Sequence, residues 1–189
     1  ARGGSKEIPK KNIINVKGKP LIWYTITASK ESKVDETWLS TDDKEIKSIA
    51  ENIGAKVIDR PISISRDNSK SEEALVHFAE NVDFDILVFI QPTSPLLRSE
   101  DIDGGLNILK DYDSVFSAYT QHWIPSWTEN IIPNSWDINN RPMRQNMEKT
   151  YIENGAFYIT TKKLLIKNKN RYSGKIGMYL MPFIRSIQI

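Results

Sequence analysis

The feature that most constrains the fold of this chain is a continuous apolar run at residues 86–90, Ile-Leu-Val-Phe-Ile. Such a run is typical of a strand that is covered on both faces, as in a parallel sheet. It is far shorter than the roughly 20 apolar residues that a membrane helix needs. We therefore expect a buried strand at residues 85–90.

Helical and strand patterns alternate along the rest of the chain. The expected helices cover residues 20–32, 44–53, 72–81, 99–110 and 161–167. The other expected strands cover residues 36–41, 55–59, 114–119, 156–159 and 177–180. This order indicates an α/β fold with a mostly parallel sheet, and such sheets bind ligands at the carboxyl ends of their strands.

Composition limits the classes of function. The 189 residues suit one domain with a small appendage, and the net charge of +2 indicates neither a nucleic-acid nor a membrane partner. The absence of cysteine rules out disulfides and thiolate metal sites, and neither His77 nor His122 has a recognisable triad partner. No secretory signal pattern is visible, so we expect a cytoplasmic protein.

Residues 121–149 differ from the rest of the chain. They contain Trp123, Trp127 and Trp136 with several prolines, and they follow neither a helical nor an alternating period. A long irregular stretch in a compact domain is usually a lid or a partner-binding arm. We therefore divide the chain into an α/β core at 1–120, an inserted arm at 121–149 and a return to the core sheet at 150–189.

The opening stretch, Ala1-Arg-Gly-Gly-Ser-Lys6, has the composition of a phosphate-binding loop. Paired glycines let backbone N–H groups approach a ligand, and Arg2 and Lys6 add positive charge. The order of residues is not that of a Walker loop. A flexible basic terminus explains the composition about equally well, and for the nearby Lys11 a solvated turn is the simpler interpretation.

Three further stretches have polar groups next to expected strands. Residues 91–98 place Gln91, Thr93 and Ser94 between two prolines, and rigid polar groups at a strand end suit a small-molecule pocket. Residues 40–42 could hold a metal or a hydroxyl, although helix capping by Asp42 is favoured. The acidic triplet at 83–85 is similar to the metal site of many glycosyltransferases, but it precedes its strand, and we favour a solvated loop.

Taken together, these stretches resemble the acylneuraminate cytidylyltransferases, a family that includes enzymes for legionaminic acid. The opening residues and residues 91–98 are the most specific matches. The matching pieces occur in the family's order at residues 1–6, 8–12, 39–42, 60–61, 65–67, 91–98 and 153–158.

The resemblance implies a Rossmann-like, GT-A-like nucleotidyltransferase fold, a three-layer sandwich with an inserted dimerisation arm. It implies a homodimer that uses Mg²⁺ and couples CTP to a nine-carbon 2-keto sugar acid, giving a CMP-sugar and pyrophosphate. Arg2 and Lys6 would be catalytic, against the phosphates. The other implied nucleotide-binding residues are Gly3, Gly4, Ser5, Lys11, Asn12, Arg60 and Asp67. The implied acid-binding residues are Gln91, Thr93, Ser94, Arg144, Asn154 and Tyr158.

The chain departs from the family in three places. Ile152 and Glu153 stand where some members have Arg-Pro, which favours a relative of sialic acid such as legionaminic acid. Family members carry an apolar strand directly before the equivalent of Ala1, and a pair of metal-binding aspartates that would begin just after Ile189. We therefore expect the chain to be a fragment that is poorly stable and weakly active or inactive unless those pieces are supplied.

Three other interpretations stay open. A 3-deoxy-manno-octulosonate cytidylyltransferase has the same architecture, but its opening loop usually reads Ser-Thr-Arg. A non-catalytic nucleotide-binding or dimerising module would also fit a chain without the metal aspartates. A retaining glycosyltransferase built on Asp83 and Asp85 ranks last.

Overall fold

The structure is a computed structural model that describes residues 1–4 and 8–189. The helices are α1 (Leu21–Lys30), α2 (Lys44–Ile53), α3 (Ser71–Asn81), α4 (Ser99–Leu109) and α5 (Lys162–Asn168). The longer strands are β3 (Trp38–Thr41), β4 (Lys56–Asp59), β5 (Ile86–Ile90), β6 (Ser114–Gln121), β9 (Thr150–Thr161) and β10 (Ile176–Leu180). The shorter elements are η1 (Lys11–Ile13), β1 (Asn15–Val16), β2 (Lys19–Pro20), η2 (Ile62–Ile64), β7 (Ser126–Trp127), β8 (Pro133–Asn134), η3 (Arg144–Asn146) and η4 (Phe183–Ser186).

The main sheet is mixed. Its strand order is β10-β6-β9-β5, and β3 pairs with β4 in a separate two-stranded parallel ladder. Strand β10 is parallel to β6, whereas β9 runs antiparallel to both β6 and β5. The α/β class is confirmed, and the expectation of a mostly parallel sheet needs one refinement. The chain leaves the body along β6 and returns along its neighbour β9, so these two strands have to be antiparallel.

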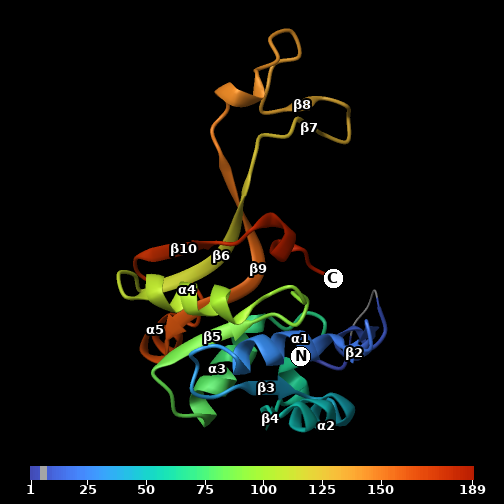
Figure 1. Ribbon diagram of the computed structural model, residues 1–189, viewed down its shortest axis with the longest axis vertical. Coiled ribbons are helices and arrows are strands. Elements are labelled where there is room, and N and C mark those ends of the chain that lie inside the picture. Colours follow the sequence, from blue (N-terminus) through green and yellow to red (C-terminus); the bar gives the residue numbers. More distant parts are fainter. Residues whose placement is uncertain (5–7) are drawn as a thin grey trace.

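Helices lie on both sides of the sheet, which makes the body a three-layer sandwich (Figure 1). On the α1 and α4 side, Ile102 packs with Phe157 and Ile159 of β9 in the largest group of buried side chains. The opposite side holds a smaller group in which Leu75 of α3 and Leu165 of α5 are buried. Apolar helix faces therefore lie on both sides of the sheet, as in other α/β architectures. The expectation that β5 is buried was wrong, because Ile86 is exposed and Leu87, Val88, Phe89 and Ile90 are only partly buried.

Helix α2 begins and ends at residues whose chemistry sets its bounds. Oδ1 of Asp43 accepts hydrogen bonds from the N–H groups of Glu45 and Ile46, at 2.8 and 3.0 Å. Gly54 ends the helix with a φ of 90°, a left-handed conformation that glycine adopts without strain. The expectation that Asp42 caps this helix was wrong, because the capping residue is Asp43. Asp42 instead accepts a hydrogen bond from the opening loop.

The arm at residues 121–149 projects away from the body (Figure 1). Strands β7 and β8 pair with each other inside it, and Trp136 makes edge-on ring contacts with Trp123 and Trp127 at centroid distances of 6.3 and 5.1 Å. The arm therefore has a small aromatic cluster of its own. Among the described residues, no helix is long and apolar enough to cross a membrane.

Candidate active site

The opening loop lies at the carboxyl end of β3. The N–H of Gly3 donates a hydrogen bond to Oδ1 of Asp42 at 3.0 Å, and Asp42 directly follows the strand. A Cβ atom on Gly3 would lie 2.7 Å from Oδ2 of Asp43, so the loop can approach the start of α2 only with glycine here. No atom lies within 4 Å of the Cβ position of Gly4, so its surroundings are open.

Arg60 places a fixed positive charge beside this loop. Its Nε donates to Oγ of Ser40 at 3.0 Å, and its Nη2 donates to the Ser40 carbonyl oxygen at 2.8 Å. Burial lowers the pKa of the Arg60 guanidinium, the charge of Asp42 opposes that effect, and the charge of Arg2 adds to it. An arginine remains protonated at neutral pH in spite of such a shift, so Arg60 can bind an anionic ligand.

Arg2 connects the loop to residues 65–67. Its Nη1 donates to Oδ1 of Asp67 at 3.1 Å and to the Arg66 carbonyl oxygen at 2.8 Å. The buried Asn12 donates from Nδ2 to the Arg2 carbonyl oxygen at 2.9 Å, which fixes the backbone of the loop. Two expected loop residues, Ser5 and Lys6, lie outside the described residues.

A second group of polar residues follows β5. The N–H of Gln91 donates to the Ala156 carbonyl oxygen at 3.1 Å, and the N–H of Ser94 donates to the Gln91 carbonyl oxygen at 3.3 Å. Ser94 is buried, and its Oγ has no hydrogen-bond partner within residues 1–4 and 8–189. A buried hydroxyl without a partner is unfavourable unless a ligand or a water molecule satisfies it.

The two groups meet at Ile189. Its N–H donates to the Thr93 carbonyl oxygen at 3.0 Å, and its own carbonyl oxygen accepts from Nζ of Lys11 at 3.3 Å. The structure therefore brings the expected nucleotide loop and the expected acid-binding loop to the same end of the sheet.

Asn154 is buried, and its side-chain amide forms hydrogen bonds with other residues of the protein. Its Oδ1 accepts from Oγ of Ser117 at 2.6 Å and from the N–H of Ala156 at 3.1 Å, and its Nδ2 donates to Oγ of Ser186 at 2.9 Å. The residue is 5% exposed. These contacts connect β6, β9 and η4, so Asn154 is placed to position the site.

Tyr158 is also buried, and it belongs to a network on the α3 and α5 side of the sheet. Its hydroxyl donates to Oε1 of Glu153, and Tyr172 donates to the other carboxylate oxygen at 2.5 Å. Burial and the neighbouring Glu153 raise the pKa of Tyr158 to about 12. The guanidinium of Arg171 lies over the Tyr158 ring at 4.6 Å and bonds to Glu72 at 2.7 Å. No local motif marked Tyr172 or Arg171, because only the fold brings them to Tyr158.

The structure places Arg144 and the acidic triplet at residues 83–85 away from these loops. Arg144 lies in η3 of the arm and is exposed, and in Figure 1 the arm extends away from the loops of the body. The acidic triplet precedes β5, at the opposite end of that strand from Gln91. Within the triplet, Asp83 forms an ion pair with Lys162 at 3.1 Å, and Phe84 stacks on Phe78.

Metal ligands are sparse in this site. The described part of the chain contains no cluster of three or more histidine or acidic side chains that could hold a metal ion. Mg²⁺ in nucleotide sites is commonly held by one or two carboxylates together with substrate phosphates. Asp42, next to the Gly3 N–H, fits that smaller requirement.

Comparisons with known proteins agree with this geometry. The sequence pattern described as "Cytidylyltransferase" matches residues 1–182. The chain is 37% identical to N-acylneuraminate cytidylyltransferase B of Danio rerio, over 100% of this chain and 47% of that protein. It is 34% identical to the CMP-N,N'-diacetyllegionaminic acid synthase of Legionella pneumophila, over 92% of this chain and 80% of that protein.

Among solved structures, the fold is similar to a CMP:2-keto-3-deoxy-manno-octonic acid synthetase complexed with CTP. The TM-score is 0.69 at 19% identity, over 93% of this chain and 76% of that one, which supports the Rossmann-like nucleotidyltransferase fold. The chain spans about half the length of the fish relatives that it matches. On the extent of the sequence match and the 34% identity to the Legionella enzyme, this chain belongs to the cytidylyltransferase family.

Proposed function

We propose that this chain forms the nucleotidyl-transfer site of an enzyme that couples CTP to a nine-carbon 2-keto sugar acid of the sialic or legionaminic type. The relatives named for N-acylneuraminate and for diacetyllegionaminic acid support this substrate class. The observation that carries the proposal is the contact of the Gly3 loop with Asp42, beside Arg2 and Arg60. That loop lies at the sheet end where the residues after β5 also lie.

In the proposed complex, the opening loop holds the triphosphate. The backbone around Gly3 and Gly4 allows close approach of phosphate oxygens, and Arg2 and Arg60 neutralise part of their charge. Lys6 would add a further cation next to the phosphates. Arg60 and Asp67 would lie on the cytidine side, as the resemblance implies.

The loop after β5 holds the sugar acid. Gln91 and Thr93 present polar groups at the strand end, and the unpartnered Oγ of Ser94 is a hydrogen-bonding group that a hydroxyl or carboxylate of the acid would satisfy. Because both reactants are anions, the enzyme has to bring like charges together, and the nearby cations lower that barrier.

The reaction is an in-line displacement at phosphorus. The oxygen of the anomeric hydroxyl attacks the α-phosphorus of CTP, its proton passes to solvent water, and the bond between the α-phosphorus and the oxygen that bridges to the β-phosphorus breaks. Pyrophosphate leaves with that electron pair. The chain's residues contribute by holding both reactants in line and by stabilising charge at the phosphates. Asp42 would help to hold Mg²⁺, which would supply further neutralisation of the negative charge.

We further propose that the enzyme is a homodimer that forms through the arm. The arm exposes apolar side chains, and Ile131 and Ile132 are 79% and 59% exposed. Exposed apolar groups of this kind favour a protein partner. If Arg144 contacts the sugar acid, as we propose, it does so in the site of a second copy, because its own arm extends away from its own body.

Binding of CTP to the wild-type chain and to Arg2→Ala, measured by isothermal titration calorimetry with Mg²⁺ present, tests the phosphate loop. Losing a charge-assisted contact to phosphate costs about 1.5–3 kcal/mol, so the variant should bind roughly ten- to a hundredfold more weakly. Arg98→Ala is the matched control, since Arg98 is exposed and pairs only loosely with Glu100 at 3.6 Å. Equal CTP affinity in all three proteins would exclude the loop as the phosphate site.

A further inference from the structure

Glu153 carries an exposed carboxylate beside the loop that follows β5. Strand β9 runs antiparallel to β5 with Phe157 opposite Ile90, so Glu153 lies beyond the last residue of β5, where that loop begins. A Cβ atom on Gly155 would lie 3.0 Å from Oε1 of Gln91, so β9 passes directly beside the loop here. The proposed function assigns this loop to the sugar acid, and it gives Glu153 no role.

Two tyrosines fix the orientation of this carboxylate. Tyr158 donates to Oε1 of Glu153, and Tyr172 donates to Oε2 at 2.5 Å. The two rings meet edge-on at a centroid distance of 5.8 Å, and Phe116 packs edge-on against Tyr172 at 6.0 Å. An ionised carboxylate can accept about four hydrogen bonds, so these two leave acceptor capacity on both oxygens. The structure therefore presents a preorganised hydrogen-bond acceptor next to the loop.

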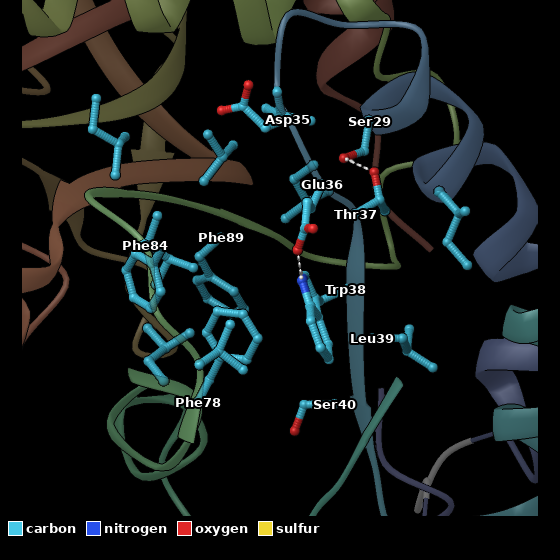
Figure 2. A pocket seen from close by; sticks show the side chains of 18 of the residues that line it. Ser29, Asp35, Glu36, Thr37, Trp38, Leu39, Ser40, Phe78, Phe84 and Phe89 are labelled. Atoms are coloured by element: carbon cyan, nitrogen blue, oxygen red, sulfur yellow. Dashed lines mark hydrogen bonds between the residues drawn. The ribbon is translucent and has the colours of Figure 1, made fainter. Parts of the chain in front are cut away.

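Arg171, the cation of this network, is held against aromatic rings. Its guanidinium lies 5.1 Å from the ring centre of Phe89 and 4.6 Å from that of Tyr158. Figure 2 shows Phe89 together with Phe78 and Phe84 on one side of a pocket, so Arg171 lies against an aromatic wall. The Arg171 side chain is 13% exposed. It is therefore packed in place and largely withdrawn from solvent.

The charge of Arg171 is used by a different acidic residue. Its Nε donates to Oε1 of Glu72 at 2.7 Å. No ion pair within residues 1–4 and 8–189 includes Glu153. The negative charge of Glu153 is therefore not neutralised by a paired cation, and it would repel a negatively charged group of a ligand. A neutral donor, such as a hydroxyl or an amide N–H, would be attracted instead.

The proposed substrate carries both kinds of group. A nine-carbon 2-keto sugar acid has its carboxylate at C1 and, in its ring form, has hydrogen-bond donors beyond C4 only on C5 and on C7–C9. Repulsion between like charges disfavours contact of the C1 carboxylate with Glu153. The acid would therefore bind with C1 directed away from Glu153 and with a donor of C5 or C7–C9 directed toward it.

We propose that Glu153 determines specificity for the sugar acid, because its carboxylate accepts a hydrogen bond from a hydroxyl or amide N–H on C5 or C7–C9 of the acid. This proposal rests on the proposed function, since it concerns the same site and the same substrate. It adds a residue that selects a neutral donor and rejects an acid with a second negative group at that position.

The dissociation constant of the acid tests this role. It is measured by NMR titration with Mg²⁺ and a CTP analogue that has a methylene group between the α- and β-phosphorus, so that no transfer occurs. The proteins are the wild-type chain, Glu153→Gln, Tyr172→Phe and the matched control Glu80→Gln. Glu80 is also exposed, but it lies near the end of α3 that leads into the start of β5. The ligands are N-acetylneuraminic acid and two analogues, of which one lacks the C5 substituent and the other lacks C7–C9.

We expect Glu153→Gln to weaken binding of N-acetylneuraminic acid about fivefold or more, because an amide oxygen is a weaker acceptor than a carboxylate. Tyr172→Phe should change this binding less than about threefold, since the carboxylate remains, and Glu80→Gln should leave it unchanged. Binding of the CTP analogue should be equal in all four proteins. With one of the two acid analogues, Glu153→Gln should bind as tightly as the wild-type chain, and that analogue identifies the donor.

Equal affinity of the wild-type chain and Glu153→Gln for N-acetylneuraminic acid would overturn this proposal and leave the proposed function intact. An equal loss in Tyr172→Phe, or a loss in Glu153→Gln that persists with both analogues, would also overturn it, because Glu153 would then act only through the tyrosines. If the wild-type chain bound no acid, the proposed function itself would fail, and this proposal with it.

Discussion

Arg185 donates two hydrogen bonds to the fully buried carboxylate of Asp101, from Nε to Oδ2 at 3.0 Å and from Nη2 to Oδ1 at 2.7 Å. The pair ties η4 to α4. Because η4 leads directly into Ile189, which lies between the two ligand loops, this ion pair holds one side of the candidate site in place.

The two side chains of this ion pair differ in exposure, so substituting one should destabilise the protein more than substituting the other. The Asp101 side chain is 0% exposed, whereas that of Arg185 is 19% exposed. Arg185→Met leaves a buried charge without its partner and should lower the free energy of unfolding by about 3 kcal/mol. Asp101→Asn leaves an arginine that can still reach water and should cost less. In urea unfolding, the double variant with both Arg185→Met and Asp101→Asn should be at least as stable as Arg185→Met alone, because it no longer buries an unpaired charge. A double variant that is less stable would contradict this interpretation.

Ser94→Ala separates a ligand-binding role from a structural one. Because Oγ of Ser94 has no partner in the described residues, removing it should leave the free energy of unfolding unchanged or slightly raised. If the hydroxyl contacts the sugar acid, the variant should show a several-fold higher KM for the acid with unchanged affinity for CTP. Thr160→Ala is the matched control, since its Oγ1 is also buried and unpartnered but lies on β9, away from the loop. A loss of stability in Ser94→Ala alone would indicate a structural hydroxyl.

The arm predicts the oligomeric state. If it forms a homodimer interface, Ile132→Glu should place a charge in an apolar contact and shift the chain toward monomer, as measured by light scattering after size exclusion. Ile166→Glu is the control, because Ile166 is also exposed, at 43%, but lies on α5. A wild-type monomer at high micromolar concentration would argue against the arm as a dimer interface.

Regular, local patterns were sufficient to predict much of the fold. The bounds of α2 were predicted without error, because apolar side chains recur at helical spacing and Gly54 ends the helix. Strand β9 was predicted only at residues 156–159, yet it covers Thr150–Thr161. Its first half contains Glu153, Asn154 and Gly155, which have no strand pattern, and pairing with β6 makes it a strand.

The sequence was sufficient to predict which loops carry the polar groups of the candidate site, but not which contacts those groups make. The sequence placed polar groups after β3 and β5, where the structure has them. It could not show that the amide of Asn154 is used by Ser117 and Ser186, because these partners lie more than thirty residues away in either direction. It also assigned the cap of α2 to Asp42, since two adjacent aspartates both suit that position and only the backbone geometry separates them.

Product formation tests the central claim most directly. The chain is incubated with CTP, Mg²⁺ and, in separate reactions, N-acetylneuraminic acid, diacetyllegionaminic acid and 3-deoxy-manno-octulosonic acid, and the phosphorus-containing products are identified by ³¹P NMR. The proposed function predicts a CMP-sugar and pyrophosphate in equal amounts with a nine-carbon acid, and little or no product with the eight-carbon acid. Formation of more CMP-sugar with the eight-carbon acid than with either nine-carbon acid would contradict it.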